Sequence, residues 1–357
     1  MTTKISDLHI AREDLLPAPR ELQRELPAGE AEAAHIAQAR AAVQAILCGE
    51  DERLLAIVGP CSIHEPASAL EYARRLRAYS LQASDALYLV MRVYFEKPRT
   101  RMGWKGLIYD PDLDGRGDIG AGLRRARSIL LDCARLGVPA ASEILDLVTP
   151  QYYAELLTWG AIGARTVESP LHRQMASALS APVGFKNATD GSVQTAVDAI
   201  LVAAQPHTFP SVSLDGRAMI VQSTGNPCGH LILRGSYEGS NYDAASVRRA
   251  ANTLAQAGLP PRLIVDCSHG NSGKDYRKQP EAAASVADQI AGGSRAICGV
   301  MLESHLVEGK QAITDKLEDL RYGQSVTDGC IGWEQTTAVL ERLAAAVRSR
   351  RAVHGRL

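Results

Sequence analysis

The chain of 357 residues lacks several features that would each indicate a class of protein. Its charge is almost balanced, with 39 Lys and Arg against 40 Asp and Glu, which argues against a general binder of nucleic acid or of a membrane surface. No apolar run approaches the ~20 residues of a membrane span, and the N-terminus has no apolar signal-peptide core. The seven cysteines show no CxxC spacing, which is typical of reduced thiols in the cytoplasm rather than of a disulfide framework.

The pattern from residue 51 onward alternates short apolar strands with amphipathic helices. With 46% hydrophobic residues, the chain can bury a large core. We predict eight strands, at residues 54–58, 86–93, 138–142, 161–164, 182–185, 230–233, 262–265 and 296–302. Eight alternating units indicate an α/β protein, a (β/α)8 TIM barrel with parallel strands.

Two segments stand outside this alternation. Residues 1–50 are predicted to form an N-terminal extension, partly extended in residues 1–30, before the barrel at 51–357. Apolar arms around Asp215 and Gly216 predict an inserted β-hairpin at about 209–224. A helix is also expected from Thr149 to Gly160.

Polar residues follow most of the predicted strands. Because the C-terminal strand ends of a barrel converge on one face, these residues are expected to form a ring there. The ring consists of Cys61, Arg92, Glu143, Arg165, Lys186, Arg234, His269 and Glu303.

Five cations near these strand ends form a group that we call the cationic cup. Any one of them alone is more plausibly part of a surface salt bridge. Together they suit a small ligand that carries both phosphate and carboxylate groups. The members of the cationic cup are Arg92, Lys97, Arg165, Lys186 and Arg234.

A second set, the metal group, consists of Cys61, His269, Glu303 and Asp328. One thiolate, one imidazole and two carboxylates suit a divalent metal ion such as Mn, Fe, Co or Zn. No spacing motif supports the set, and a lone Cys or His is more often structural. An anion cup beside a Lewis acid nevertheless suggests an enol phosphate that meets an aldehyde.

The motifs Gly59-Pro-Cys-Ser-Ile-His64 and Lys97-Pro-Arg-Thr100 carry a family resemblance, supported by residues 92–96, 160–166, 182–187, 233–235, 265–269 and 326–328. Nearly end to end, the chain resembles the type I 3-deoxy-D-arabino-heptulosonate 7-phosphate (DAHP) synthases. The resemblance implies condensation of phosphoenolpyruvate with erythrose 4-phosphate to give DAHP and phosphate, the first step of the shikimate pathway.

The resemblance also implies a role for each matching residue. The cationic cup would hold phosphoenolpyruvate, and the metal group would hold the metal ion. Glu143 would position the water that attacks C2, and Lys97 would protonate the aldehyde oxygen, with a metal-bound water as the alternative donor. Erythrose 4-phosphate would be bound by Pro98, Arg99 and Thr100.

Members of this family are inhibited by an aromatic amino acid at a separate site. The matching positions are Asp7, Pro150, Gln151, Ser180, Phe209, Ser211 and Val221. Ser211 resembles the phenylalanine- and tryptophan-sensitive members, and residues 222–230 look nearer the tryptophan-sensitive kind, so one of these two amino acids is the expected effector. Alternatively, the hairpin serves only as a subunit contact. The resemblance further implies a homodimer or homotetramer.

Two other interpretations compete with this one. A 3-deoxy-octulosonate 8-phosphate synthase shares the barrel and the cup but usually carries an Asn-Arg-Ser type of segment after the lysine, where this chain has Pro98-Arg99-Thr100. A non-catalytic barrel that binds phosphorylated metabolites would not need the complete metal group or Lys97.

Overall fold

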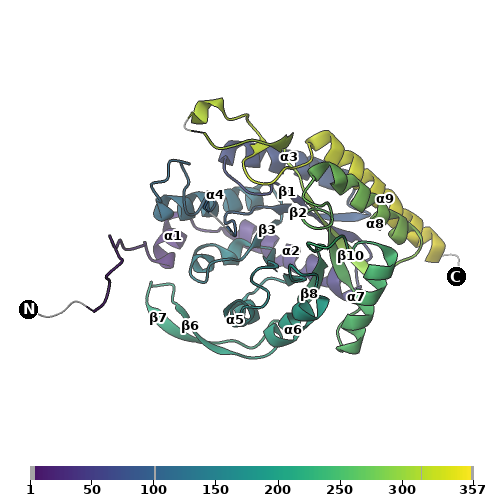
Figure 1. The fold of residues 1–357 in the computed structure, drawn as a ribbon, viewed down its shortest axis with the longest axis horizontal. Coiled ribbons are helices and arrows are strands. Elements are labelled where there is room, and N and C mark those ends of the chain that lie inside the picture. The colour runs from purple at the N-terminus through teal and green to yellow at the C-terminus, as the bar shows by residue number, and fades with distance from the viewer. Residues whose placement is uncertain (1–4, 100–101, 315, 355–357) are drawn as a thin grey trace, which may run out of the picture.

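Eight parallel strands close into a barrel, which confirms the predicted (β/α)8 fold (Figure 1). The computed structural model describes residues 5–99, 102–314 and 316–354. Around the barrel the neighbours run β1-β10-β9-β8-β5-β4-β3-β2. These strands are β1 (Leu54–Gly59), β2 (Leu87–Arg92), β3 (Ala140–Glu143), β4 (Trp159–Ile162), β5 (Val183–Lys186), β8 (Gly229–Leu233), β9 (Leu263–Asp266) and β10 (Ile297–Glu303).

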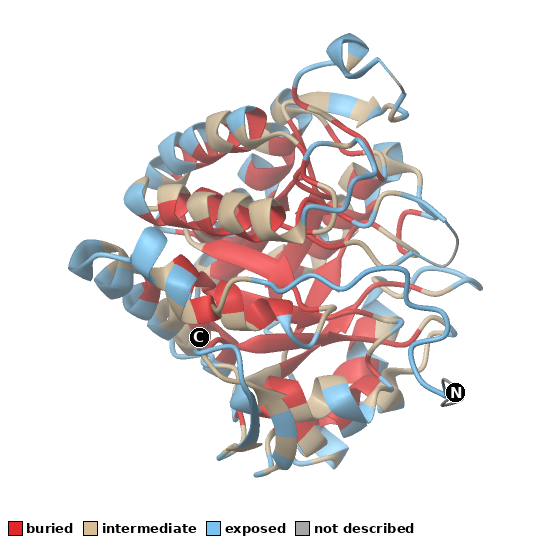
Figure 2. Ribbon diagram, turned by 90° about the vertical axis from the view of Figure 1, so that its left-hand side faces the viewer, coloured by how far each residue is buried: buried red, intermediate tan, exposed pale blue. Residues whose placement is uncertain are grey.

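Helices surround the strands and turn their apolar faces inward (Figure 2). In α4, for example, Leu123, Ala126 and Leu130 are buried at helical spacing, and the Asp118 carboxylate caps the helix by accepting from the Ala121 N–H at 2.9 Å. None of the helices within the described residues is long and apolar enough to cross a bilayer. The outer helices are α3 (Pro66–Gln82), α4 (Ile119–Arg135), α5 (Pro170–Ala178), α6 (Val193–Ala203), α7 (Ala244–Gln256), α8 (Gln279–Ala291) and α9 (Trp333–His354).

Helix α2 (Glu30–Cys48) closes the N-terminal end of the barrel. Its Val43, Ile46 and Leu47 are buried in the same apolar cluster as Leu55 and Trp159 on the barrel strands. The helix stops at Gly49, whose φ of +85° is a left-handed conformation that glycine adopts without strain. The extension therefore contains a part of the barrel core.

A β-hairpin is inserted between α6 and β8, as predicted. It pairs β6 (Thr208–Val212) with β7 (Ala218–Gln222), and Phe209 lies opposite Val221. The N-terminal arm leaves the body of the molecule near helix α1 (Pro19–Glu25) (Figure 1). Arg20 of α1 holds the hairpin tip through its backbone N–H, which donates to the Leu214 carbonyl at 2.8 Å, and through an ion pair of 2.6 Å with Asp215.

One expectation about local structure was wrong. The segment 149–160 is not one helix but two short 3-10 helices, η1 (Thr149–Tyr152) and η2 (Ala154–Leu156). The chain already enters the barrel at Thr158, whose N–H donates to the Ala140 carbonyl, so too few residues remain for an α-helix. Within the first 30 residues, which were predicted to be only partly extended, α1 forms against the hairpin.

Several short elements were not anticipated from the sequence. Helix α5 lies between β4 and β5, and a parallel strand pair forms far down the chain. The pair and two further 3-10 helices are β11 (Val307–Lys310), β12 (Gln324–Ser325), η3 (Tyr276–Lys278) and η4 (Leu317–Asp319).

Candidate active site

The C-terminal ends of the strands surround a cavity of about 330 Å³. Arg92, Glu143, Lys186 and Glu303 are the last residues of β2, β3, β5 and β10, and Arg234 follows β8. The predicted site residues that line this cavity are Lys97, Pro98, Arg99, Glu143, Arg165, Lys186, Arg234, His269 and Asp328. Thr100, the remaining predicted contact for erythrose 4-phosphate, lies outside the described residues.

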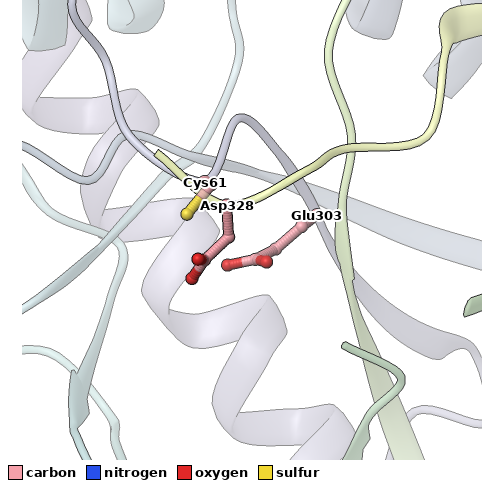
Figure 3. A group of neighbouring side chains, drawn as sticks. All are labelled: Cys61, Glu303 and Asp328. Carbon is pink, nitrogen blue, oxygen red and sulfur yellow. The ribbon is translucent and has the colours of Figure 1, made fainter. Parts of the chain in front are cut away.

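Three members of the metal group converge on one point beside the cavity (Figure 3). One ligand atom from each of Cys61, Glu303 and Asp328 lies within 4.8 Å of the other two. His269 lies next to this set, with its Nε2 atom 3.6 Å from Glu303 Oε1. Sulfur, imidazole and carboxylate donors in one place fit a borderline divalent metal ion.

Lys97 stands directly against this group. Its Nζ donates to the carbonyl oxygen and to Sγ of Cys61, both at 3.1 Å. Burial alone would lower the pKa of Lys97, but Cys61 and Glu303 raise the pKa above its ordinary value. Burial raises the pKa of the Cys61 thiol to about 11, and Glu303 adds to this shift. Lys97 is therefore protonated at neutral pH and able to donate a proton.

Arg92 does not line the cavity. Its side chain is fully buried, with Nη2 3.1 Å from Glu303 Oε1 and the guanidinium 3.9 Å from the centre of the Tyr94 ring. Arg92, which was predicted to belong to the cationic cup, is thus buried behind the cavity lining and pairs with Glu303 of the metal group. Its contact with phosphoenolpyruvate stays a prediction.

The other cup residues are held by neighbouring loops and strand ends. Arg165 Nη1 donates to the Pro98 carbonyl at 3.2 Å, which joins the turn after β4 to the Lys97 loop. The Arg234 N–H donates to Asn187 Oδ1 at 2.8 Å. A Cβ atom at Gly163 would overlap with Glu143 Oε1, so glycine at that position leaves room for the Glu143 carboxylate.

Sequence reasoning missed two charged residues at this site, Lys274, which lines the cavity, and Asp266. Asp266 is the last residue of β9 and fully buried, and its Oδ2 atom lies 3.0 Å from Lys186 Nζ and 2.8 Å from His269 Nδ1. Burial alone would raise the pKa of Asp266, but His269 and Lys186 hold this pKa well below its ordinary value. The rule that strand ends carry the site points to Asp266 as well, because Asp266 directly follows the predicted strand 262–265, as Glu143 follows 138–142. The predicted ring instead contains His269, three residues further on.

A second cavity of about 520 Å³ lies between the hairpin, the η1 segment and α5. Six of the seven predicted effector residues line it: Pro150, Gln151, Ser180, Phe209, Ser211 and Val221. Gln151 Nε2 donates to Ser211 Oγ at 3.3 Å across the cavity wall. Asp7, the seventh, is exposed on the N-terminal arm and is not among the lining residues.

A barrel whose mouth combines clustered cations with sulfur, nitrogen and oxygen donors is typical of metal-dependent enzymes that act on phosphorylated substrates. Residues 30–341 match the model of the DAHP synthetase I family, and the chain belongs to this family. The predicted reaction, condensation of phosphoenolpyruvate with erythrose 4-phosphate at the start of the shikimate pathway, is thereby confirmed.

Individual relatives resemble the chain over nearly its whole length. A phenylalanine-sensitive phospho-2-dehydro-3-deoxyheptonate aldolase from Escherichia coli K12 is 53% identical, over 98% of this chain and 100% of the relative. The tyrosine-sensitive enzyme of the same organism is 51% identical, over 95% of each chain. A solved structure of the enzyme from Francisella tularensis SCHU S4 superposes with a TM-score of 0.93 at 48% identity, covering 96% of this chain and 99% of the other.

Proposed function

We propose that the cavity at the C-terminal strand ends binds phosphoenolpyruvate through Lys97, Arg165, Lys186 and Arg234. The observation that carries this proposal is the gathering of these four cations around one cavity. Phosphoenolpyruvate presents a carboxylate and a phosphate, which Arg and Lys side chains bind by charge-assisted hydrogen bonds. Arg92 supports the cup from below through its contact with Glu303.

The metal group provides the second half of the site. Cys61, His269, Glu303 and Asp328 hold one divalent ion, of which Mn, Fe, Co and Zn all suit these donors. When bound, the ion supplies Lewis acidity beside the aldehyde of erythrose 4-phosphate. Pro98 and Arg99 line the same cavity and are assigned to erythrose 4-phosphate, together with Thr100.

The residues of the chain then orient the reactants and move protons. The cup directs C3 of phosphoenolpyruvate toward the aldehyde carbon. Lys97, which is held in its charged form, donates a proton to the new alkoxide. Glu143 lines the cavity and orients the water that adds to C2, after which the phosphate leaves.

Phosphate release from phosphoenolpyruvate and erythrose 4-phosphate tests this assignment. Turnover should stop after EDTA treatment and return with Mn²⁺. Cys61→Ala should lose this metal-dependent turnover, whereas Cys48→Ala, at an exposed cysteine outside the site, should keep it. Full metal-dependent turnover by Cys61→Ala would contradict the metal assignment. Turnover with arabinose 5-phosphate alone would favour an octulosonate synthase, and no turnover with either aldose phosphate would favour a binding protein.

The second cavity is proposed to bind an aromatic amino acid that inhibits the enzyme. Support comes from its largely apolar lining, which includes Leu147, Met175 and Phe209, and from the polar pair Gln151 and Ser211 at one wall. Such a site suits an apolar ring with one polar end. Relatives that are 51–53% identical to this chain include tyrosine-, phenylalanine- and tryptophan-sensitive enzymes, so overall identity does not discriminate between the three effectors. Because of Ser211, we favour phenylalanine or tryptophan.

Inhibition assays with each aromatic amino acid test the effector site. Ser211→Gly removes the hydroxyl that Gln151 contacts and should raise the inhibitory concentration of the effector or change which amino acid inhibits. Ser213→Gly makes the same change on the same hairpin outside the cavity lining and should leave inhibition unchanged. Equal inhibition of the wild type and of Ser211→Gly by every aromatic amino acid would show that the effector binds elsewhere.

We further propose that the enzyme forms homodimers or homotetramers, in which residues 1–50 make regulatory and subunit contacts. Ile5, Leu8 and Leu15 are exposed on the arm and suit burial against another copy. A cytoplasmic location is consistent with the seven cysteines, all of which are free thiols in the structure. Sedimentation of the full chain would test the oligomer; a monomer at assay concentration would exclude it.

A further inference from the structure

Asp266 joins the two halves of the active site. Its Oδ2 atom touches both a cation of the cup, Lys186 Nζ at 3.0 Å, and a residue of the metal group, His269 Nδ1 at 2.8 Å. Its Oδ1 atom accepts from the hydroxyl of Ser268 at 2.6 Å and from the Ser268 N–H at 3.0 Å. All four contacts are buried around one carboxylate, so the carboxylate has little freedom to turn.

These contacts decide which nitrogen of His269 carries the proton. The Ser268 hydroxyl lies between the two residues, 2.6 Å from Asp266 Oδ1 and 2.7 Å from His269 Nδ1. Because an ionised carboxylate only accepts hydrogen bonds, the hydroxyl donates to Asp266, and Nδ1 must donate to the hydroxyl oxygen. Nδ1 is therefore the protonated nitrogen, and its N–H also lies 2.8 Å from the charged Asp266 Oδ2. The lone pair is then on Nε2, the atom that faces Glu303 Oε1 at 3.6 Å. An imidazole in this state can bind a metal ion through Nε2, with its ring orientation fixed by the carboxylate.

The backbone conformation of His269 also indicates that its position is constrained by the surrounding structure. Its φ of +56° is a left-handed conformation, which is strained for a residue with a side chain. The turn is closed by the Lys274 N–H, which donates to the His269 carbonyl at 2.8 Å. Surrounding contacts, including the one to Asp266, hold the residue in this conformation and aim the ring at Glu303.

We propose that Asp266 is a positioning residue for the reaction, and that its carboxylate couples metal binding at His269 to phosphoenolpyruvate binding at Lys186. This inference rests on the proposed function, since it uses the assigned roles of His269 and Lys186. Asp266 is fully buried and is not among the residues that line the cavity, so it acts through its two neighbours rather than on the substrate.

The test compares binding to the wild type and to Asp266→Asn. Affinity for Mn²⁺ is measured from the free-ion signal in electron paramagnetic resonance, and affinity for phosphoenolpyruvate by calorimetry with EDTA and again with Mn²⁺. An Asn amide neither neutralises Lys186 nor requires a proton on His269 Nδ1. We therefore expect Mn²⁺ affinity to fall by about 10- to 100-fold. The factor by which Mn²⁺ tightens phosphoenolpyruvate binding in the wild type should fall toward one.

Two further variants separate positioning from a structural role. Asp51→Asn changes a carboxylate that is paired with Arg53 at 2.6 Å, before β1 at the other end of the barrel, and should alter neither affinity. Ser268→Ala keeps the Asp266 carboxylate but removes the hydroxyl that links Asp266 Oδ1 to His269 Nδ1, and it should cause a smaller loss of Mn²⁺ affinity. If Asp266→Asn does not fold, the Mn²⁺ affinity of Ser268→Ala becomes the deciding measurement. An affinity equal to that of the wild type would overturn the proposal.

The remaining outcomes are equally distinct. A folded Asp266→Asn with lower thermal stability but unchanged coupling would make Asp266 a purely structural residue and overturn the inference alone. A wild type that binds both ligands without any coupling would also overturn it. A wild type that binds neither Mn²⁺ nor phosphoenolpyruvate would instead refute the proposed function, and the inference with it.

Discussion

Glu96 is a buried carboxyl group that lies between the two cavities, and its replacement by glutamine should remove a pH-dependent loss of stability. Only 1% of the residue is exposed, and its Oε1 atom accepts from the Thr149 hydroxyl at 2.9 Å. The next residue, Lys97, lines the active-site cavity, and Pro150, after Thr149, lines the second cavity. Burial raises the pKa of Glu96 from 4.5 to about 7, and the nearby Asp146 adds to the shift.

The sign and size of the effect follow from this shift. Between about pH 4.5 and 7 the folded protein holds a proton on Glu96 that the unfolded chain releases, so stability falls as the pH rises. Each pKa unit corresponds to about 1.4 kcal/mol, so the loss above pH 7 is about 3 kcal/mol. Glutamine stays neutral, and its amide oxygen can still accept from Thr149. Glu96→Gln should therefore be more stable than the wild type above pH 7 and nearly equal to it below pH 5.

Urea unfolding at several pH values between 5 and 8.5, in EDTA and without substrates, measures this difference. The stability advantage of Glu96→Gln should grow between pH 5 and about pH 7 and then level off. Glu168→Gln makes the same change at an exposed glutamate and should run parallel to the wild type. A Glu96→Gln variant whose advantage is the same at pH 5.5 and pH 8.5 would refute the reasoning.

Two further variants test the segment between β2 and α4, which contains Lys97 and, at Ile108, packs against Gly122 of α4. Lys97→Met should lower turnover by roughly 10²- to 10⁴-fold by removing the proton donor. Its Mn²⁺ affinity should be kept or increased, because a cation 3.1 Å from Cys61 Sγ is lost; weaker Mn²⁺ binding would indicate that Lys97 supports the metal group instead. Gly122→Ala should destabilise the protein by about 2 kcal/mol or more in thermal unfolding, since the new Cβ overlaps with the Ile108 carbonyl. Gly160→Ala, whose Cβ has no contact closer than 3.8 Å, should cost much less.

The barrel and most of its mouth were predictable because the strands and the residues that end them recur in a regular pattern. Arg92, Glu143 and Lys186 are strand-end residues in the structure as well. What could not be predicted depends on contacts that no local pattern shows. Helix α1 forms where Arg20 meets the hairpin tip, almost 200 positions away in sequence, at Leu214.

Within the site, the burial of Arg92 and the role of Asp266 were hidden for a related reason. The sequence pattern shows that a strand ends in a charged residue, but it does not show which neighbouring side chain that residue faces in the fold. Arg92 faces Glu303 rather than the cavity, and Asp266 lies one residue beyond the predicted end of its strand. Asp266 and His269 both follow this strand, and the sequence does not show that both belong to the site and lie 2.8 Å apart.

Helix α2 has a consequence for the order in which the molecule can be completed. Its Val43, Ile46 and Leu47 precede every strand of the barrel in the sequence, yet the barrel end that they fill is closed only when β1 pairs with β10. Leu55 of β1 lies opposite Gly299 of β10, more than 240 positions later in the chain. Until then the apolar face of α2 has no complete partner. During synthesis, the apolar face of α2 therefore stays open to non-native contacts until β10, the last strand of the barrel, has been made.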